Sequence, residues 1–201
     1  MTGWTTHTGR AVALPQDGID TDQIIPARFM SQPRAAGYGD FLLYDLRHDP
    51  AGKPRADFPL NAAPGASILV AGRNFGCGSS REAAVYALVD AGFRAVIAPS
   101  FGDIFSANAV NNGLAPIRLD SDAIETLRGA THDVTVNLQE LRITVGNRQT
   151  AFDLDPVWQQ KLIEGWDDID MTKAWAGKIA AFRSADRAGR DWAWPRPVIT
   201  E

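Results

Sequence analysis

A glycine-bearing turn holds the residue types best suited to chemistry: Arg73-Asn74-Phe75-Gly76-Cys77-Gly78-Ser79-Ser80-Arg81-Glu82. Gly76 and Gly78 permit a positive φ and a close approach of the backbone to a ligand. The hydroxyl groups of Ser79 and Ser80 come directly before Arg81. The Arg81 guanidinium matches a carboxylate or phosphate through two parallel hydrogen bonds. The turn therefore predicts an anion-binding site with a candidate nucleophile or base.

The elements around this turn indicate a strand–helix–strand unit. An apolar run at residues 68–71 comes before the turn, and a second one occupies residues 95–98. Between them, Val85, Leu88 and Val89 have helical spacing. Such a unit has two parallel strands joined by a helix, and ligands bind at the carboxyl ends of its strands. The first amide groups of the helix carry partial positive charge, so they also attract anions.

A second interpretation of the helix start stays open beside the first. Ser79 and Glu82 fit the S-x-x-E capping box, in which the serine caps the helix and the glutamate reaches back to the cap. Three other motifs are excluded. The turn has no lysine for a P-loop, Arg81 replaces the third glycine of a dinucleotide fingerprint, and Glu82 replaces the last glycine of a nucleophile elbow.

Composition predicts an ordinary globular chain of 201 residues with 45% hydrophobic and 22% charged residues. We expect a single domain with a core at about residues 10–154 and a helical appendage at about residues 155–201. A net charge of -4 gives no electrostatic footprint for nucleic acid. No apolar run approaches the roughly 20 residues of a membrane span. The N-terminus has no signal pattern, so we expect a cytoplasmic location.

Cysteine and histidine usage limits the metal chemistry of the chain. Cys77 is the single cysteine, so this chain alone forms no disulfide and no thiolate-ligated cluster. His7, His48 and His132 have no ligand spacing, which argues against a histidine-based metal site. Cys77 has no evident partner base, and we interpret it as a small, partly buried thiol.

The N-terminal region predicts one strand and one long loop. Residues 10–14 form the strand, and residues 19–26 follow it with Asp20, Thr21 and Asp22. The spacing does not suit calcium, so these carboxylates are expected to bond turn backbone and pair with basic groups. Residues 31–66 are punctuated by glycine and proline, which is typical of a functional loop or a disordered insert. Within them, only residues 40–46 suggest a short helix.

We interpret residues 31–66 as a loop that covers the site. Within and just before it, we expect residues 28–46 to set specificity and to become ordered when substrate and a partner subunit are present. The apolar residues of segment 28–46 have no strand to justify them: Phe29, Met30, Tyr38, Phe41 and Leu42. Gly37 and Gly39 provide hinges. A surface loop without a function is the alternative.

The remainder of the chain predicts alternating helices and strands. A helix begins near Ser100 and Asp103 and ends at Asn112-Gly113. Strands follow at 114–119, where Pro116 favours an edge, and at 134–136, 141–145 and 151–152. Residues 122–128 look helical, as do residues 155–190 with a break near Gly165. The composite is an α/β fold with mixed β structure flanked by helices.

Five strings, in the same order along the chain, resemble the small-subunit family of 3-isopropylmalate dehydratase, the swivel-domain branch of the aconitase superfamily. They are residues 20–26, 74–82, 97–105, 112–114 and 162–169. The resemblance implies a swivelling β/β/α domain with a mixed sheet or partly open barrel.

The resemblance also implies a chemistry, in which a hydroxyl group moves between adjacent carbons of a malate-type diacid by dehydration and rehydration. Ser79 matches the family's base and Arg81 matches its carboxylate-binding arginine, with Ser80 contacting the same anion. A [4Fe-4S] cluster with one open iron binds the leaving hydroxyl in this family. Because this chain has one cysteine, we expect no cofactor here and a cluster on a large-subunit partner.

Further site residues are expected around these. Gly76, Gly78, Asp20, Thr21 and Asp22 support the turn. Arg28, just past Pro26, is expected to pair with Asp20, with Asp22 or with a substrate carboxylate.

Departures from the family pattern keep the substrate open. Ala83 replaces a histidine, and Val85-Tyr86 replaces a Pro-Trp pair. Ala13 stands in the region where aconitase itself has another substrate-binding arginine, which argues against aconitase proper and its third carboxylate. An equivalent subunit for another malate-type diacid, such as methylmalate/citraconate or a homoaconitate, is the first alternative. A non-catalytic module that binds small anions is the second.

Overall fold

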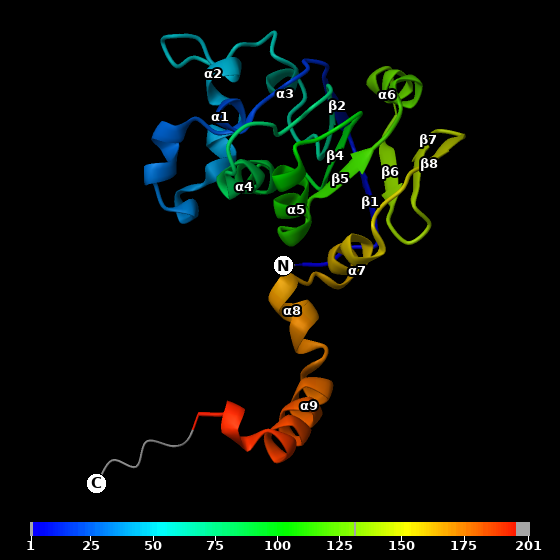
Figure 1. Ribbon diagram of the computed structural model, residues 1–201. Helices are drawn as coiled ribbons and strands as arrows, with labels where there is room; N and C mark the ends of the chain where they lie inside the picture. Colours follow the sequence, from blue (N-terminus) through cyan, green and yellow to red (C-terminus); the bar gives the residue numbers. More distant parts are fainter. Residues whose placement is uncertain (1, 131, 196–201) are drawn as a thin grey trace. The chain divides into compact units, whose positions relative to one another are not determined.

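Within residues 2–130 and 132–195, which the computed structural model describes, eight strands form two separate four-stranded sheets. The first sheet is parallel, with the order β2 (Ala11–Leu14), β3 (Ile68–Ala71), β4 (Ala95–Ala98) and β5 (Ala115–Arg118). Helix α4 (Glu82–Asp90) connects β3 to β4, and α5 (Asp103–Asn111) connects β4 to β5. The predicted strand–helix–strand unit is confirmed, and Pro116 lies on an edge strand (Figure 1).

The second sheet is antiparallel and contains a strand that the sequence pattern did not indicate. Its order is β1 (Thr6–Gly9), β6 (Val134–Asn137), β7 (Arg142–Val145) and β8 (Arg148–Ala151). Gly146, with a φ of 55°, lies in the hairpin turn between β7 and β8. Strand β1 was not predicted, because Thr-His-Thr-Gly has no alternation of apolar and polar residues. It is a strand because it pairs with β6.

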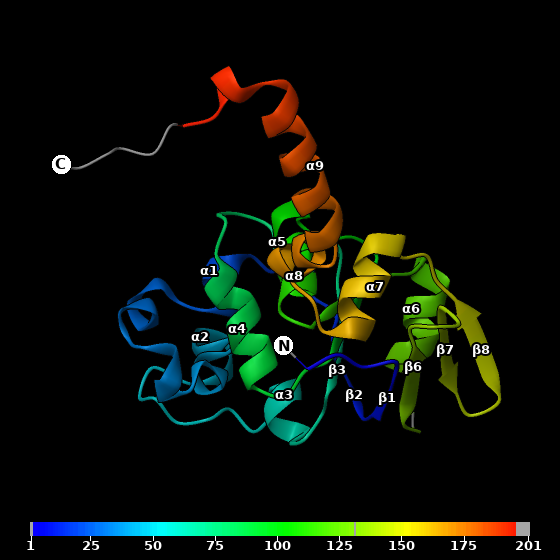
Figure 2. The same cartoon turned by 90° about the horizontal axis from the view of Figure 1, so that it is seen from below.

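The parallel strands are buried on both faces, which explains their unbroken apolar character. Leu69 and Ala71 belong to a core beneath α4 and α5, whereas Ile68 and Val70 belong to a second core shared with the antiparallel sheet. Figure 2 shows α1, α2 and α4 on one side of the parallel sheet and β6–β8 on the other. The predicted β/β/α fold class is thereby confirmed.

The structure differs from the predicted mixed sheet in how the strands are grouped. Parallel and antiparallel strands separate into two sheets, and the strand order found in the described residues closes neither sheet into a barrel. Two further helices border the second core, namely α6 (Ser121–Arg128) and α7 (Pro156–Glu164). Gly165, with a φ of 73°, ends α7 at the predicted break.

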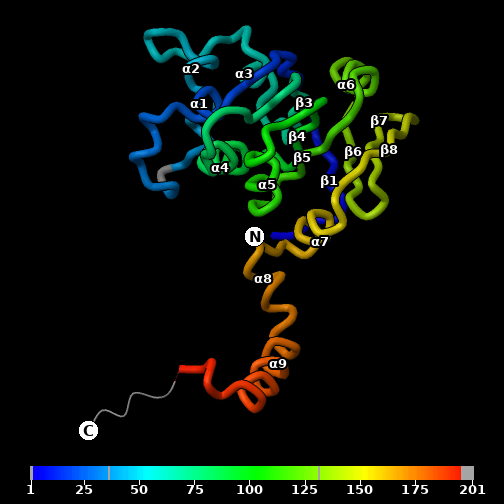
Figure 3. The backbone as a smooth tube through the Cα atoms, in the orientation of Figure 1, coloured from blue at the N-terminus to red at the C-terminus, as the bar shows by residue number. Residues whose placement is uncertain are grey.

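The segment from residue 21 to residue 62 is more helical than the sequence indicated. It contains α1 (Thr21–Ile24), η1 (Ala27–Ser31), η2 (Arg34–Ala36), η3 (Tyr38–Phe41), α2 (Tyr44–Arg47) and α3 (Pro59–Ala62). Tyr38, Leu42 and Leu43 are buried in the core that includes α4, and the tube in Figure 3 shows the path of this segment. Where the sequence suggested one short helix at residues 40–46, the chain forms the end of η3 and the start of α2. The other helices were not indicated, because three to five residues are too few for a periodic apolar pattern.

The chain divides into two compact units, and the first of them ends at Asp167. Helix α7 therefore belongs with the sheets: Leu162 is fully buried, and its carbonyl accepts a hydrogen bond of 3.0 Å from the Trp4 amide. The second unit begins at Asp168 and contains α8 (Asp168–Lys173), α9 (Ala176–Gly189) and η4 (Asp191–Ala193), none of which has a buried residue. The single-domain organisation stays a prediction.

None of the helices in the described part of the chain combines the length and apolar character that a membrane span requires.

Candidate active site

The glycine-bearing turn lies between two other loops and is hydrogen-bonded to both through its backbone. On one side, the Gly76 amide donates to the Ile19 carbonyl at 2.8 Å, and the Thr21 amide donates to the Cys77 carbonyl at 3.0 Å. These bonds join the loop after β2 to the loop after β3. Because the two strands are parallel neighbours, their carboxyl ends meet at one sheet edge, which is the expected place for a ligand.

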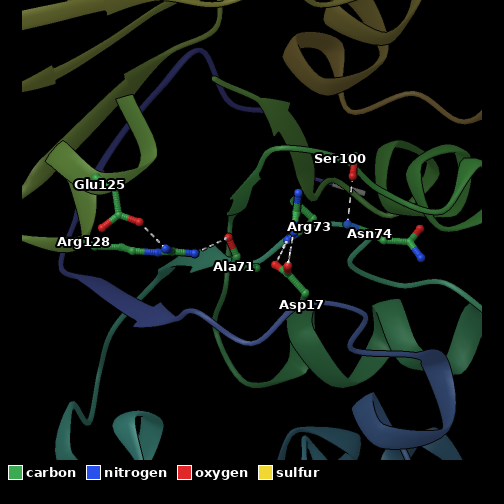
Figure 4. A network of polar contacts seen from close by, with 7 residues as sticks. All are labelled: Asp17, Ala71, Arg73, Asn74, Ser100, Glu125 and Arg128. Carbon is green, nitrogen blue, oxygen red and sulfur yellow. Dashed lines mark hydrogen bonds and ion pairs between the residues drawn. The ribbon is translucent and has the colours of Figure 1, made fainter. Parts of the chain in front are cut away.

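On its other side, the turn is joined to the loop after β4. The Phe75 amide donates to the Ser100 carbonyl at 3.1 Å, and the Gly102 amide donates to the Phe75 carbonyl at 2.9 Å. The Asn74 amide adds a bond of 2.8 Å to the Ser100 hydroxyl (Figure 4). The turn is thus the middle of three backbone segments that come from three consecutive parallel strands.

Figure 4 also shows how the outer edge of the turn is held. Asp17 accepts hydrogen bonds from the Arg73 amide at 2.7 Å and from Arg73 Nε at 3.1 Å. The bond from the backbone amide is the main cause that lowers the pKa of the Asp17 carboxyl. At neutral pH this carboxylate is therefore charged and holds the first residue of the turn in place.

The two glycines of the turn are required by the backbone, as predicted. Gly76 has a φ of 73° and Gly78 a φ of 91°, in the region that L-residues rarely adopt. A Cβ atom at Gly76 would lie 2.2 Å from a ring carbon of Phe105. The Phe105 ring is buried and contacts the Phe75 ring edge-on at 5.4 Å between centroids. The turn therefore rests directly on the aromatic core with no room for a side chain.

The capping-box interpretation of the turn is wrong. Helix α4 begins at Glu82, its N-cap is Arg81, and no side chain caps it. Ser79 lies before the cap, and its carbonyl accepts a hydrogen bond of 2.8 Å from the Thr21 hydroxyl. The Glu82 carboxylate does not reach back but accepts a bond of 2.9 Å from Asn112 Nδ2. Long-range bonds to other loops have replaced the local capping pattern.

A capping box does exist in the site, at a helix that the sequence did not reveal. The Asp20 carboxylate accepts a bond of 2.7 Å from the Gln23 amide, and Gln23 Oε1 accepts one of 3.0 Å from the Asp20 amide. The four-residue helix α1 is thereby held against the turn. The prediction that Asp20 bonds turn backbone is confirmed.

Arg81 forms an ion pair with Asp22, so the predicted pairing of an aspartate in this stretch with a basic group is confirmed. The Arg81 side chain is 20% exposed, while Asp22 is largely open to solvent. The contact uses Arg81 Nη1. A guanidinium has five N–H donors in a planar fork, so one carboxylate contact leaves others for a second anion.

A cavity of about 260 Å³ opens at this junction. Its lining comes from all three loops and comprises Thr21, Gly76, Cys77, Gly78, Ser79, Ser80, Arg81, Gly102, Asp103, Ile104 and Phe105. Ser79 and Ser80 are exposed, so both hydroxyl groups are accessible to a ligand. Cys77 is partly exposed, as predicted, and its thiol donates to the Gly18 carbonyl at 3.6 Å. The arrangement brings two hydroxyls and a guanidinium to one small opening.

Gly102, Asp103, Ile104 and Phe105 were not predicted as site residues. They belong to the site because β4 is the next parallel strand, so its carboxyl end lies beside that of β3. That topological rule is the signal that identifies them.

Arg28 is not among the residues that line this cavity. It pairs with Asp45 rather than with Asp20 or Asp22, so the predicted aspartate partners are wrong. Its guanidinium lies 4.5 Å from the centre of the Phe29 ring, and its hydrogen bond lowers the pKa of the Asp45 carboxyl. A contact between Arg28 and a substrate carboxylate stays a prediction.

The segment 28–46 packs against α4. Arg34 forms an ion pair with Asp90 at 2.7 Å and lies 4.0 Å from the centre of the Tyr86 ring. Of the apolar residues named for specificity, Tyr38 and Leu42 are core residues, whereas Met30 is 41% exposed. A specificity role therefore stays a prediction for this segment, with Met30 as its most accessible apolar member.

Within residues 2–130 and 132–195, no group of three or more His, Cys, Asp and Glu side chains has the arrangement to hold a metal ion.

Comparison with known proteins assigns the class first. Residues 1–122 match the family model described as the aconitase C-terminal domain. This match agrees with a β/β/α fold that places the glycine-bearing turn at the carboxyl end of a parallel strand.

Named relatives then narrow the assignment. The 3-isopropylmalate dehydratase small subunit of Geobacillus kaustophilus is 46% identical over 189 residues, covering 90% of this chain and 96% of the relative. The corresponding Bacillus subtilis protein is 45% identical over 187 residues, covering 89% and 94%. The crystal structure of 3-isopropylmalate dehydratase from Methanocaldococcus jannaschii is similar, with a TM-score of 0.64, 30% identity and coverage of 90% and 99%. The chain belongs to the family of 3-isopropylmalate dehydratase small subunits.

Substitution of Gly76 by alanine tests whether the turn depends on this glycine. Gly76→Ala is expected to cost about 1–2 kcal/mol for the left-handed backbone and about 1–3 kcal/mol more for overpacking against Phe105. Gly92→Ala is the matched control, because Gly92 has a φ of 96° but no atom within 4 Å of an added Cβ. Urea unfolding followed by circular dichroism measures both, and equal losses would contradict the close packing of the turn.

Proposed function

We propose that this chain is the small subunit of a hydro-lyase that interconverts 2-isopropylmalate and 3-isopropylmalate by dehydration and rehydration, in leucine biosynthesis. The observation that carries the proposal is that Ser79 and Arg81 line one cavity, with Arg81 held by an ion pair to Asp22. This arrangement occurs in a chain that is 45–46% identical to named small subunits over about 90% of its length. We propose a cytoplasmic location as well.

Ser79 is proposed as the base that removes the carbon-bound proton. Its oxygen accepts the proton, the C–H electron pair forms the double bond, and the hydroxyl group leaves from the neighbouring carbon. A serine hydroxyl is a weak base at neutral pH, so its alkoxide needs positive potential nearby. Arg81 and the uncapped first turn of α4 supply that potential. The bond from Thr21 to the Ser79 carbonyl holds the serine backbone in position.

Arg81 is proposed to hold a substrate carboxylate through two of its N–H groups. The Asp22 carboxylate restrains the guanidinium before substrate arrives, and Asp22 itself is largely exposed. A substrate carboxylate at the cavity would share Arg81 with Asp22 or displace it. Ser80, exposed in the same lining, is proposed to contact the same carboxylate.

The residues of this chain do not fit an iron–sulfur cluster, because it has one cysteine and its described part has no metal-ligating group. We propose that the [4Fe-4S] cluster implied by the family is bound by a large subunit. That subunit would close over the exposed turn and complete the site. The relatives are named small subunits, which supports a larger partner.

Reconstitution tests this function directly. The purified chain alone is expected to be colourless and inactive, and addition of a large subunit with its cluster is expected to restore turnover of 2-isopropylmalate. Parallel assays with methylmalate, citraconate and homoaconitate separate the other malate-type substrates. Tight diacid binding by the chain alone, without turnover in any complex, would instead indicate a binding module.

Ser79→Ala is expected to lower turnover of the reconstituted complex by about 10²–10⁴-fold, as is typical when a general base is lost. Because Ser79 makes no helix cap, the unfolding free energy should change little. Ser121→Ala, at the exposed start of α6, is the matched control and should retain activity. A folded, assembled Ser79→Ala complex with near-normal turnover would refute the assignment of the base.

Arg81→Lys keeps the charge but loses the planar fork that grips a carboxylate. We expect a higher KM and a lower turnover while the two subunits still assemble. Arg55→Lys is the control, since Arg55 pairs with Asp57 on the surface and does not line the cavity. Steady-state kinetics and size-exclusion chromatography measure the two effects, and an unchanged kcat/KM for Arg81→Lys would contradict the role.

A further inference from the structure

The cavity at the turn contains one large apolar side chain that the proposed chemistry leaves unused. Ile104 lines the cavity and is 54% exposed. Phe105, the other large apolar residue of the lining, is 3% exposed and belongs to the core. The remaining members of the lining are small or polar. Within the described residues, Ile104 therefore provides the accessible apolar surface of this cavity.

The packing of α5 determines where Ile104 lies. Phe105 is pinned below Gly76, with the Phe101 ring stacked at 6.2 Å and the Phe75 ring edge-on. Successive residues of a helix point about 100° apart, so the neighbour of an inward Phe105 must point elsewhere. The Gly102 amide bond to the Phe75 carbonyl fixes the same helix start against the turn. Ile104 therefore lines the same cavity as Ser79 and Arg81.

The position of Ile104 matches a need that the charged residues cannot meet. Arg81 and the α4 amides recognise carboxylates, which every malate-type diacid has. An alkyl substituent makes no hydrogen bonds and is recognised only by burial against apolar surface. An exposed isoleucine beside the carboxylate-binding group is suited to that contact.

We propose that Ile104 is a specificity-determining residue whose side chain packs against the alkyl substituent of an alkyl-substituted malate. The proposal rests on the proposed function of the chain and adds a residue that recognises the substituent rather than the carboxylates. It places part of the substrate selection on the rigid start of α5, in addition to any contribution from segment 28–46. A large-subunit contact at Ile104 is the competing outcome of the test.

The experiment compares two substrates that differ in the size of the substituent. Complexes with wild-type chain, Ile104→Ala and Ile104→Val are assayed with 2-isopropylmalate and with 2-methylmalate, and the subunit dissociation constant is measured for each. For Ile104→Ala we expect kcat/KM for 2-isopropylmalate to fall by roughly 10-fold or more, the range for lost apolar contacts. The value for 2-methylmalate should stay within about twofold, the range for surface changes without a specific role. Ile104→Val should lie between wild type and Ile104→Ala.

Ile169→Ala is the matched control, because Ile169 is 64% exposed and does not line this cavity. It should leave the ratio between the two substrates unchanged. Met30→Ala, measured in parallel, reports the separate contribution of segment 28–46.

The outcomes are distinguishable. If the wild-type complex is active and Ile104→Ala leaves the ratio of kcat/KM for the two substrates unchanged, the inference alone is overturned. This holds whether or not the subunits of the variant dissociate more easily. A wild-type complex that turns over neither diacid overturns the proposed function and the inference with it. Because Ile104 is exposed, circular dichroism should show that the variants are folded. A changed ratio of kcat/KM between the two substrates then reports the loss of the substrate contact.

Discussion

The backbone hydrogen bonds on both sides of the glycine-bearing turn are the constraint on which the site depends. The Gly76 amide is bound to the loop after β2, and the Phe75 carbonyl is bound to the loop after β4. Loops that carry functional groups are usually mobile, but this one is paired like the middle strand of a small sheet. The pairing requires a positive φ at Gly76 and the absence of a side chain above Phe105. Backbone conformation and packing therefore both require glycine at this position.

The ion pair between Arg81 and Asp22 is the second feature that holds the site together. Arg81 is four-fifths buried beside a helix start that already carries positive potential, so the cation needs a counter-charge before any substrate arrives. Asp22 provides it from the loop after β2. If Arg81 binds a substrate carboxylate as proposed, that carboxylate competes with Asp22 for the guanidinium. A partner that closes over the site would exclude water and strengthen the substrate contact.

Much of the parallel half of the fold was predictable from the chain. Residues 68–71 and 95–98 are unbroken apolar runs, because both faces of these strands are buried. Gly76 and Gly78 indicate a turn with positive φ. Strand β1 and most of the short helices between residues 21 and 62 were not predictable, since each is too short for periodicity; only a helix near residues 40–46 was indicated. They exist through pairing and packing with distant residues, such as β6 for β1 and α4 for η3.

The sequence by itself determined the chemistry that the site can offer: hydroxyls at Ser79 and Ser80, a guanidinium at Arg81 and no cysteine cluster. Tertiary structure decided which partner each group takes. Asp22 pairs with Arg81, which is 59 positions away in the chain. Arg28 pairs with Asp45. The Ser79 carbonyl accepts a hydrogen bond from Thr21, and Ser79 does not cap α4. The physical reason is that residue type sets charge and hydrogen-bonding capacity locally. Which neighbours come within hydrogen-bond distance depends on how three parallel strands bring their carboxyl ends together.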